Sequence, residues 1–560
     1  MGAERSLTLL DQVQTRIAGR RHRATAFVSQ PEPRTIGSYA RGRQLAAGNF
    51  RFGGHLVQAR GAGIWDIAPP NAQFAAELQG CTWLDDLARV TDGTTRRLAQ
   101  DWVAQWIREY GSGKGPGWTP ELTGRRVIRW INHALFLLNG QDGAKSQAYF
   151  ESLTRQTLFL ARRWSRAAEG LPRFEALTGL LYAAVSLEGM DGYREPAIAG
   201  IARECDAQID ATEGLPTRNP EHLMEVLLHL NWAAGVLRDA GREPPEAILG
   251  AIARIRPTLT ALRHSDGGLA RFHGGGRGSD GKLDYALGMI AGTQPVGVIE
   301  NTMGYARLCF GKTTVIADTA LPPAGARSGD AHASTLAFEL SSGRRPMIVN
   351  CGSGTPFGPD WRRAGRATPS HSTLSILGAS SAKLASEADG ELLVKPPRHV
   401  TLTSEPPEAP SAIIATHDGY APAYGLTHAR RLELSSEGGT LRGEDTLAAL
   451  SPGDQRLFDL QLDRTRLEGV PYAIRFHLHP EVEPNLDLGG SAVSLVLKGR
   501  EVWVFRFSGL AELSLEPSVY LEKGRLSPRA TKQIVLSCRV MEYVSRVTWI
   551  LTRAQDLSSR

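Results

Sequence analysis

The apolar residues of this chain change their spacing once, near residue 297, and this change restricts the fold more than any other feature. From about Leu78 to Leu262 they recur every three or four positions, as along the buried face of an amphipathic helix. After Gly297 they alternate with polar residues, as in antiparallel strands that bury one face. We therefore expect two domains of different class, a helical one followed by a β one.

Helical spacing is clearest over residues 150–164, 177–187, 223–230 and 248–262. Alternation predicts strands in TTVIADTA, TLAFEL, STLSIL, SAIIAT, RLELS, LFDLQL, IRFHLH, VSLVL, VWVFRF and QIVLSCRV. The predicted organisation is an N-terminal extension over residues 1–47, a helical domain over 48–290 and an antiparallel β domain over 291–560. The glycine-rich stretch Arg271 to Lys282 is expected to join the two domains.

Charge and cysteine content exclude some classes of protein. The formal net charge is +6 over 560 residues, which fits an anionic substrate but equally a mildly basic solvated surface. The five cysteines lie far apart without CxxC spacing, so neither a zinc ribbon nor a disulfide framework is indicated. No nucleic-acid-binding motif or Arg/Lys-rich helix is present, and we expect no nucleic-acid partner. The sequence does not indicate an oligomeric state.

The expected location follows from what the first thirty residues contain. They hold no apolar run long enough for a signal-peptide core, and no later segment approaches the ~20 apolar residues of a membrane span. The chain as written is therefore expected to be cytoplasmic and without a membrane span. A mis-assigned start or an unconventional export route would make it periplasmic instead.

Polar residues that no strand needs for folding cluster around two predicted strands. His332 precedes TLAFEL, Asn350 is the last residue of PMIVN, and Arg366 and His371 lie just before STLSIL. Such a pairing indicates a site built on a sheet. Upstream, Arg218-Asn219-Pro220-Glu221-His222 predicts a helix start, with Asn219 as the N-cap and Pro220 at the first helical position.

These motifs resemble the heparinase II/III family of polysaccharide lyases. The family carries a histidine before a strand, a V-D-x-G turn and an R-x-T-x-x-H-N-T segment. The matching residues here are His332, Val349-Asn350-Cys351-Gly352 and Arg366-Ala-Thr368-Pro-Ser-His371-Ser-Thr373. The resemblance extends from about Gly48 to Thr552 and implies an incomplete α/α toroid followed by an antiparallel β super-sandwich.

The resemblance also implies an activity, namely β-elimination on a uronate-containing polysaccharide such as a glycosaminoglycan. A carbon–oxygen lyase of this kind needs a group that neutralises the uronate carboxylate, a base, and an acid for the leaving oxygen. The implied catalytic residues are His332, Arg366, His371 and His222, which stands where the family has its tyrosine. The alternative for His222 is a helix-start residue with capping duties only.

Implied substrate-binding residues are Arg218, Asn219, Arg173, Trp65 and His477. Arg173 is the only stand-in for the family's missing Asn-His pair. Trp65 presents an aromatic face suited to sugar stacking, although core packing is the alternative. The strand IRFHLH places Arg475 and His477 on one face, which turns either toward substrate or outward to solvent.

Two questions stay open at this stage. His332, Asn350 and His371 match the positions of a zinc site, but two histidines and an amide make a poor one. Without metal, these three residues are expected to form a hydrogen-bonded knot beside Arg366. The protein is then either a lyase acting on an acidic polysaccharide or oligosaccharide, or a catalytically degenerate polysaccharide-binding protein of the same fold. The retained Arg and His residues favour the first, and the missing tyrosine and Asn-His pair favour the second.

Overall fold

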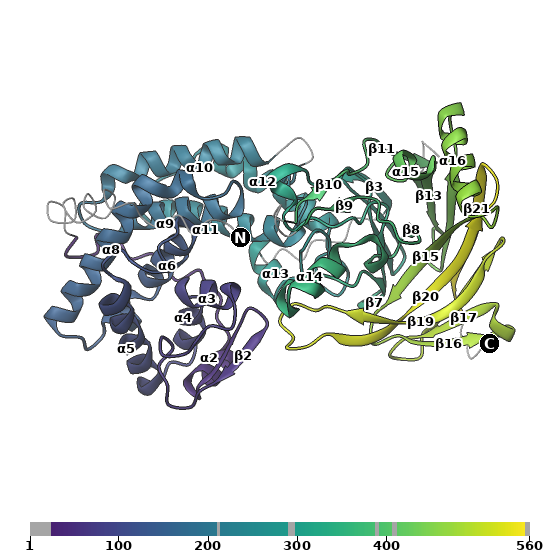
Figure 1. The fold of residues 1–560 in the computed structure, drawn as a ribbon. Helices are drawn as coiled ribbons and strands as arrows, with labels where there is room; N and C mark the ends of the chain where they lie inside the picture. The colour runs from purple at the N-terminus through teal and green to yellow at the C-terminus, as the bar shows by residue number, and fades with distance from the viewer. Residues whose placement is uncertain (1–23, 210–212, 289–296, 387–390, 406–410, 555–560) are drawn as a thin grey trace. The chain divides into compact units, whose positions relative to one another are not determined.

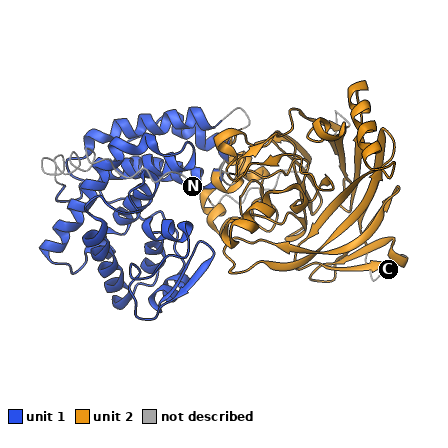
Figure 2. Cartoon of the chain, viewed as in Figure 1, with its two compact units in different colours: residues 1–210, 223–255 blue, residues 211–222, 256–560 orange. Residues whose placement is uncertain are grey.

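The computed structural model describes residues 24–209, 213–288, 297–386, 391–405 and 411–554. The chain forms two compact units, one of residues 1–210 and 223–255 and the other of residues 211–222 and 256–560 (Figure 2). We call them unit 1 and unit 2. Residues 256–288 thus group with the β-rich unit, whereas the sequence analysis assigned them to the helical domain. The predicted boundary at 290/291 lies outside the described residues.

Unit 1 is helical (Figure 1). It contains all of the helices named next except the first residues of α11 and the last residues of α12, which belong to unit 2. The helices are α2 (Tyr39–Ala46), α3 (Ala72–Gln79), α4 (Trp83–Ala88), α5 (Gly93–Tyr110), α6 (Pro120–Asn132), α7 (Ala134–Leu138), α8 (Gly143–Arg163), α9 (Leu171–Ser186), α10 (Arg194–Gln208), α11 (Pro220–Asp239) and α12 (Glu246–Ala261). A hairpin of β1 (Asn49–Phe52) and β2 (His55–Gln58) lies between α2 and α3. The helices predicted from apolar spacing are confirmed as α8, α9, α11 and α12.

Unit 2 contains two large antiparallel sheets, with nine and eight strands among the described residues, and a small sheet of β9 (Lys383–Leu384) and β10 (Leu393–Val394). The first has the order β19 (Glu512–Tyr520), β20 (Arg529–Val540), β15 (Val470–Leu478), β7 (Arg345–Val349), β6 (Phe338–Ser342), β5 (Thr313–Asp318), β4 (Tyr305–Phe310), β3 (Gly297–Thr302), and β8 (Leu374–Ile376) pairs with β15. The second has the order β11 (Val400–Glu405), β12 (Ala412–His417), β13 (Thr427–Leu434), β14 (Thr440–Ala448), β21 (Val544–Arg553), β18 (Val502–Ser508), β17 (Ala492–Val496), β16 (Glu483–Asp487). The predicted succession of a helical and a β region is confirmed.

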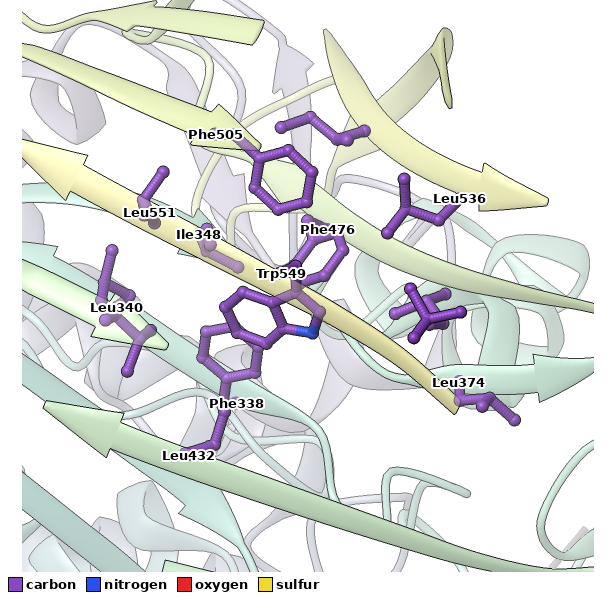
Figure 3. Close-up of a cluster of buried hydrophobic side chains, with 14 of the residues drawn as sticks. Phe338, Leu340, Ile348, Leu374, Leu432, Phe476, Phe505, Leu536, Trp549 and Leu551 are labelled. Carbon is purple, nitrogen blue, oxygen red and sulfur yellow. The ribbon is translucent and has the colours of Figure 1, made fainter. Parts of the chain in front are cut away.

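The core of unit 2 lies between the two sheets. Phe338 of β6 stacks on Trp549 of β21 with ring centroids 5.8 Å apart, and Phe476 of β15 meets the same indole edge-on at 4.8 Å (Figure 3). Inward-facing positions alternate along the strands, as in β13, where every second residue is buried. Each large side chain buried in this way contributes about 1.5–3 kcal/mol to folding stability. Apolar packing between the two sheets is therefore a major source of the stability of unit 2.

One predicted strand is wrong. LFDLQL forms part of helix α16 (Pro452–Arg464), which begins with a capping box between Ser451 and Asp454 and has Pro452 in its first turn. Only Phe458 of the helix is buried, so the short alternation of apolar residues did not reflect a half-buried sheet face. The start signal Ser-Pro-Gly-Asp outweighs an alternating pattern of six residues.

No helix among the described residues is long and apolar enough to cross a membrane.

Candidate functional site

A buried cluster in unit 2 brings together five polar residues from distant parts of the chain. Its members are Arg218, His273, Asp318, His332 and His371, and each is at most 7% exposed. Asp318 is the last residue of β5, His332 precedes β6 and His371 precedes β8. We call this group the histidine cluster.

The histidine cluster forms a continuous chain of contacts. His371 Nε2 lies 3.0 Å from His332 Nδ1, and the main-chain N–H of His332 donates to His273 Nδ1 at 3.1 Å. His273 Nε2 faces the Asp318 carboxylate at 3.4 Å. On its other side, Asp318 accepts a hydrogen bond from Arg218 Nη2 at 2.6 Å. A guanidinium group therefore lies at one end of the chain and a pair of imidazoles at the other.

A main-chain carbonyl fixes the tautomers of the two imidazoles. His371 Nδ1 lies 2.9 Å from Ala367 O, which can only accept, so Nδ1 carries the proton of this neutral ring. His371 Nε2 then accepts from His332 Nδ1. The lone pair that remains is on His332 Nε2, which makes it the basic atom of the pair.

Burial keeps the three histidines neutral. It lowers the pKa of His371 to about 4 and holds the pKa of His332 well below its ordinary value, and the neighbouring cations add to the effect on His332. The pKa of His273 is also lowered by burial, against the opposing effect of Asp318. Burial alone raises the pKa of Asp318, but Arg218, the nearby His273 ring and the hydrogen bond from Ser334 hold it below its usual range. The anion in the cluster is thus the aspartate, and it is already paired.

The two arginines predicted near the scissile sugar are held by the protein itself. All five N–H groups of Arg218 are used: it donates to Met303 O, Ala320 O, Leu321 O, Gly304 O and the Asp318 carboxylate. Arg366 donates to Ala331 O, Glu391 O and Ser328 O, each at 2.8 Å. These bonds anchor loops, which is the usual role of a buried guanidinium bonded to carbonyl groups.

The helix start predicted at Asn219 is confirmed. Its Oδ1 accepts from the main-chain N–H groups of Glu221 and His222 at 3.0 Å and 3.1 Å, and α11 begins at Pro220. Its Nδ2 donates to His273 O at 3.0 Å, which links the cap to the histidine cluster. His222 lies in the first turn of α11 and is half-buried. Its role as an acid or base stays a prediction.

His477 is buried within the first sheet, so the outward orientation is wrong for this residue. Its Nε2 donates to Pro369 O at 2.9 Å, and its Nδ1 lies 2.7 Å from Ser518 Oγ. Burial lowers its pKa to about 3. His477 therefore supports the segment just before His371.

Arg173 and Trp65 lie in unit 1 and are engaged there. Arg173 pairs with Glu204 of α10 at 3.1 Å and donates to Ala167 O. Trp65 donates its indole N–H to Trp102 O at 2.7 Å and packs edge-on against the ring of Tyr110. These contacts are those of packing residues, and substrate binding by either side chain stays a prediction.

The residues proposed for zinc do not fit a metal ion. Asn350 Oδ1 accepts from the main-chain N–H of Ser372 at 3.0 Å, so the amide offers its N–H₂ group instead, and Asn350 Nδ2 has no partner. His332 and His371 are hydrogen-bonded to each other. Within the described part of the chain, no group of three or more His, Cys, Asp or Glu is arranged to hold a metal. His332 and His371 thus form a hydrogen-bonded pair, and Asn350 bonds to the neighbouring Ser372 instead.

Sequence reasoning missed two members of the cluster, Asp318 and His273, and the buried carboxylate of Glu339 beside them. Glu339 faces Arg271 and His264 at 3.3 Å each. A signal was available, because Asp318 and Glu339 are charged residues at core positions of apolar strands and such residues are almost always paired. His273 lay in a glycine-rich stretch and gave no periodic signal.

Comparison with known families finds a match in the C-terminal part of the chain. Residues 301–550 match the "Heparinase II/III-like, C-terminal" family model. The match spans both sheets of unit 2.

Comparison with characterised proteins and solved structures extends the similarity over the whole chain. FtsZ-localized protein C of Caulobacter vibrioides is 29% identical in an alignment of 556 residues that covers 95% of this chain and 92% of that protein. The crystal structure of heparinase III superposes with a TM-score of 0.73 at 12% identity, covering 97% of this chain and 90% of the other. Heparan sulfate lyase HepC from Pedobacter heparinus gives 0.58 at 13% identity, covering 98% and 88%. The fold is therefore that of the heparinases, an α/α toroid followed by a β-sandwich.

Proposed function

Because this chain belongs to the heparinase II/III family through its C-terminal domain and its fold, we propose that it binds an acidic polysaccharide without cleaving it. The scaffold is lyase-like, and the net charge of +6 suits an anionic ligand. One observation carries the proposal: the two arginines predicted to serve cleavage are hydrogen-bonded to the protein itself, Arg218 through all of its N–H groups and Arg366 through three of them.

β-Elimination next to a uronate carboxylate needs donors aimed at the negative charge that develops there. Arg218 donates all its N–H groups to protein atoms, and Arg366 is held by three carbonyl groups. The imidazoles of His332 and His371 are neutral and bonded to each other. His332 Nε2 retains a lone pair, but burial makes this histidine a weak base. The predicted set therefore lacks the electrophilic half of a lyase mechanism.

The experiment that tests this pairs a binding assay with a cleavage assay on the same polysaccharides. Heparan-type, chondroitin-type, alginate and bacterial exopolysaccharides are titrated against the full chain, and each mixture is followed for ultraviolet absorbance of an unsaturated product. Binding without product is the expected result. Product formation that is lost in both His222→Ala and His332→Ala would establish a lyase instead.

A second function is favoured by the relative that matches over nearly its whole length. FtsZ-localized protein C covers 95% of this chain at 29% identity, whereas heparinase III is 12% identical. On this ground the chain associates with FtsZ, and the lyase fold serves as a binding scaffold. Co-sedimentation with assembled FtsZ, compared with unassembled FtsZ, tests it. Sedimentation that is the same with and without FtsZ would rule the association out.

A further inference from the structure

Three hairpin turns of unit 2 each combine a glycine with exposed cations. They are Gly311-Lys312 at the β4–β5 turn, Gly343-Arg344-Arg345 at the β6–β7 turn and Lys498-Gly499-Arg500 at the β17–β18 turn. The φ angles of the three glycines lie between 52° and 87°, in the left-handed region that tight turns use. Arg345 is partly exposed and the other four cations are exposed. We call these five side chains the basic turn surface.

Contacts between neighbouring turns join the three into one surface. The main-chain N–H of Gly343 donates to Lys312 O at 2.6 Å, which connects the first turn to the second. Arg345 connects the second to the third, because its Nη1 faces the carboxylate of Glu501 at 3.3 Å. Its guanidinium also lies against Gly499, where a Cβ atom would be 2.5 Å from Nη2. The glycine therefore leaves room for the arginine that bridges the two turns.

The charge of this surface is mostly unpaired and positive. Lys498 pairs with Glu481 at 2.8 Å. Three cations form no ion pair with any residue that the structure describes, namely Lys312, Arg344 and Arg500. One exposed carboxylate stands beside them: the main chain of Glu437, in the β13–β14 turn, lies next to Gly311, and its side chain is likewise without an ion pair in the described chain. Three unpaired cations thus face one unpaired carboxylate.

No large apolar side chain accompanies these cations. Among the described residues, every exposed large hydrophobic side chain lies outside 311–312, 343–345, 435–439 and 498–500. A protein interface depends on aromatic or apolar anchors at its centre, and single-stranded nucleic acid is bound by stacking on aromatic rings. The anionic groups of an acidic polysaccharide need only exposed Lys and Arg side chains, which bind sulfate and carboxylate directly.

The basic turn surface is separate from the histidine cluster. Lys312 comes just before β5, and Asp318 is the last residue of this strand, so they lie at opposite ends of it. Because a strand rises about 3.3 Å per residue, the six residues of β5 place them about 20 Å apart. The arginines near the cluster are held by protein atoms, whereas the cations of the turns are exposed.

We propose that the basic turn surface binds the sulfate or carboxylate groups of an acidic polysaccharide. The inference rests on the proposed polysaccharide binding and names the surface that performs it. Exposed cations attract a polyanion over a distance set by the salt concentration, so this binding is strongest at low salt.

The test is titration of the full chain with heparan sulfate, chondroitin sulfate and alginate at low salt. The triple variant Lys312→Gln/Arg344→Gln/Arg500→Gln is expected to bind about tenfold more weakly than the parent, because three exposed charge contacts are lost. The difference should largely disappear at about 1 M salt, where the screening length falls to about 3 Å. Glu437→Gln is expected to strengthen binding about twofold to threefold, because it removes the carboxylate beside the cations.

A second triple variant, Arg456→Gln/Arg464→Gln/Arg466→Gln, is the matched control. It removes the same charge from exposed arginines of α16 and the residues after it, and none of the three forms an ion pair within the described chain. Helix α16 follows the last residues of β14, whereas Glu437 precedes the first, so the control lies at the other end of that strand. The control is expected to bind each polysaccharide as the parent does.

Three outcomes would contradict the inference. Parent-like binding by the first triple variant, or an equal loss in the control, overturns the basic turn surface while leaving polysaccharide binding intact. Tighter binding of double-stranded DNA than of all three polysaccharides assigns the surface to nucleic acid instead. Failure of all three polysaccharides to bind the parent chain overturns the proposed function itself.

Discussion

Asp445 and Arg430 form a bidentate ion pair across strands β14 and β13 in the interior of the sandwich. Arg430 Nε and Nη2 donate to the two carboxylate oxygens at 2.8 Å and 3.0 Å, and both side chains are at most 2% exposed. His428 and the indole N–H of Trp549 complete the shell of the carboxylate. Arg430 also donates to Leu336 O and Ser372 O, and this ties the second sheet to loops of the first.

Asp445→Ala is expected to destabilise the protein by about 3–5 kcal/mol, because it leaves the buried Arg430 without a counter-charge. Urea unfolding measures the change. Glu444→Ala is the matched control, since Glu444 is the neighbouring residue and pairs with the largely exposed Arg546, a contact worth at most about 1 kcal/mol. Equal losses in the two variants would contradict the assigned role of the pair.

Acid is expected to destabilise unit 2 in two stages. Burial lowers the pKa of His371 to about 4 and the pKa of His477 to about 3. Below about pH 6.5 these histidines therefore bind protons in the unfolded chain but stay neutral in the folded protein, which favours unfolding. Below about pH 4 the unfolded aspartates follow, while Asp318 and Asp445, whose pKa values are lowered by their arginine partners, stay charged in the fold. The free energy of unfolding should therefore fall from about pH 6.5 downward, and a value unchanged between about pH 7.5 and pH 5 would refute this.

Arg366→Met is expected to destabilise the fold by about 3 kcal/mol or more, because three buried carbonyl groups lose their donor. Binding of polysaccharide per folded molecule should not change. Arg363→Met on the same helix α14 (Pro359–Arg366) is the control, since Arg363 is half-exposed and its loss should cost at most about 1 kcal/mol. A variant of Arg366 with normal stability and lost binding would show that this guanidinium acts on the ligand.

Chelators and zinc are both expected to leave the thermal midpoint unchanged. Ligands that bind only the folded state raise the midpoint, and the described residues provide no group of three metal-binding side chains. Thermal unfolding with EDTA and with added zinc measures this. A zinc-dependent rise that disappears in His332→Gln would instead assign a metal to His332 and His371.

Most of the fold was predictable from apolar spacing. The four strongest helical segments and nine of the ten alternating runs coincide with helices or strands of the structure, because burial of one face imposes a period on the residues that form it. LFDLQL failed for a physical reason. Six residues are too few to distinguish the two periods, and the capping box of Ser451 and Asp454 decided the outcome.

The histidine cluster was only partly predictable. His332 and His371 were found through a motif, but their partner His273 lies 59 residues from His332, and Asp318 lies 100 residues from Arg218. No local pattern specifies such pairings, since they depend on how the sheet brings loop ends together. The exposure of the motif residues could not be predicted from the sequence either. A motif identifies side chains, but it does not show whether their N–H groups face a ligand or the protein's own carbonyl groups.

The discontinuity of unit 2 restricts how this chain can be divided. Residues 211–222 group with the β-rich unit, although residues 223–255, which follow them, return to the helical one. A fragment that starts at residue 256 would lack Arg218 and leave the Asp318 carboxylate buried without its guanidinium. The β-rich half is therefore not a transferable module. If this half is exchanged between homologues, in the laboratory or by recombination, residues 211–222 have to be exchanged with it, or Asp318 has to be replaced at the same time.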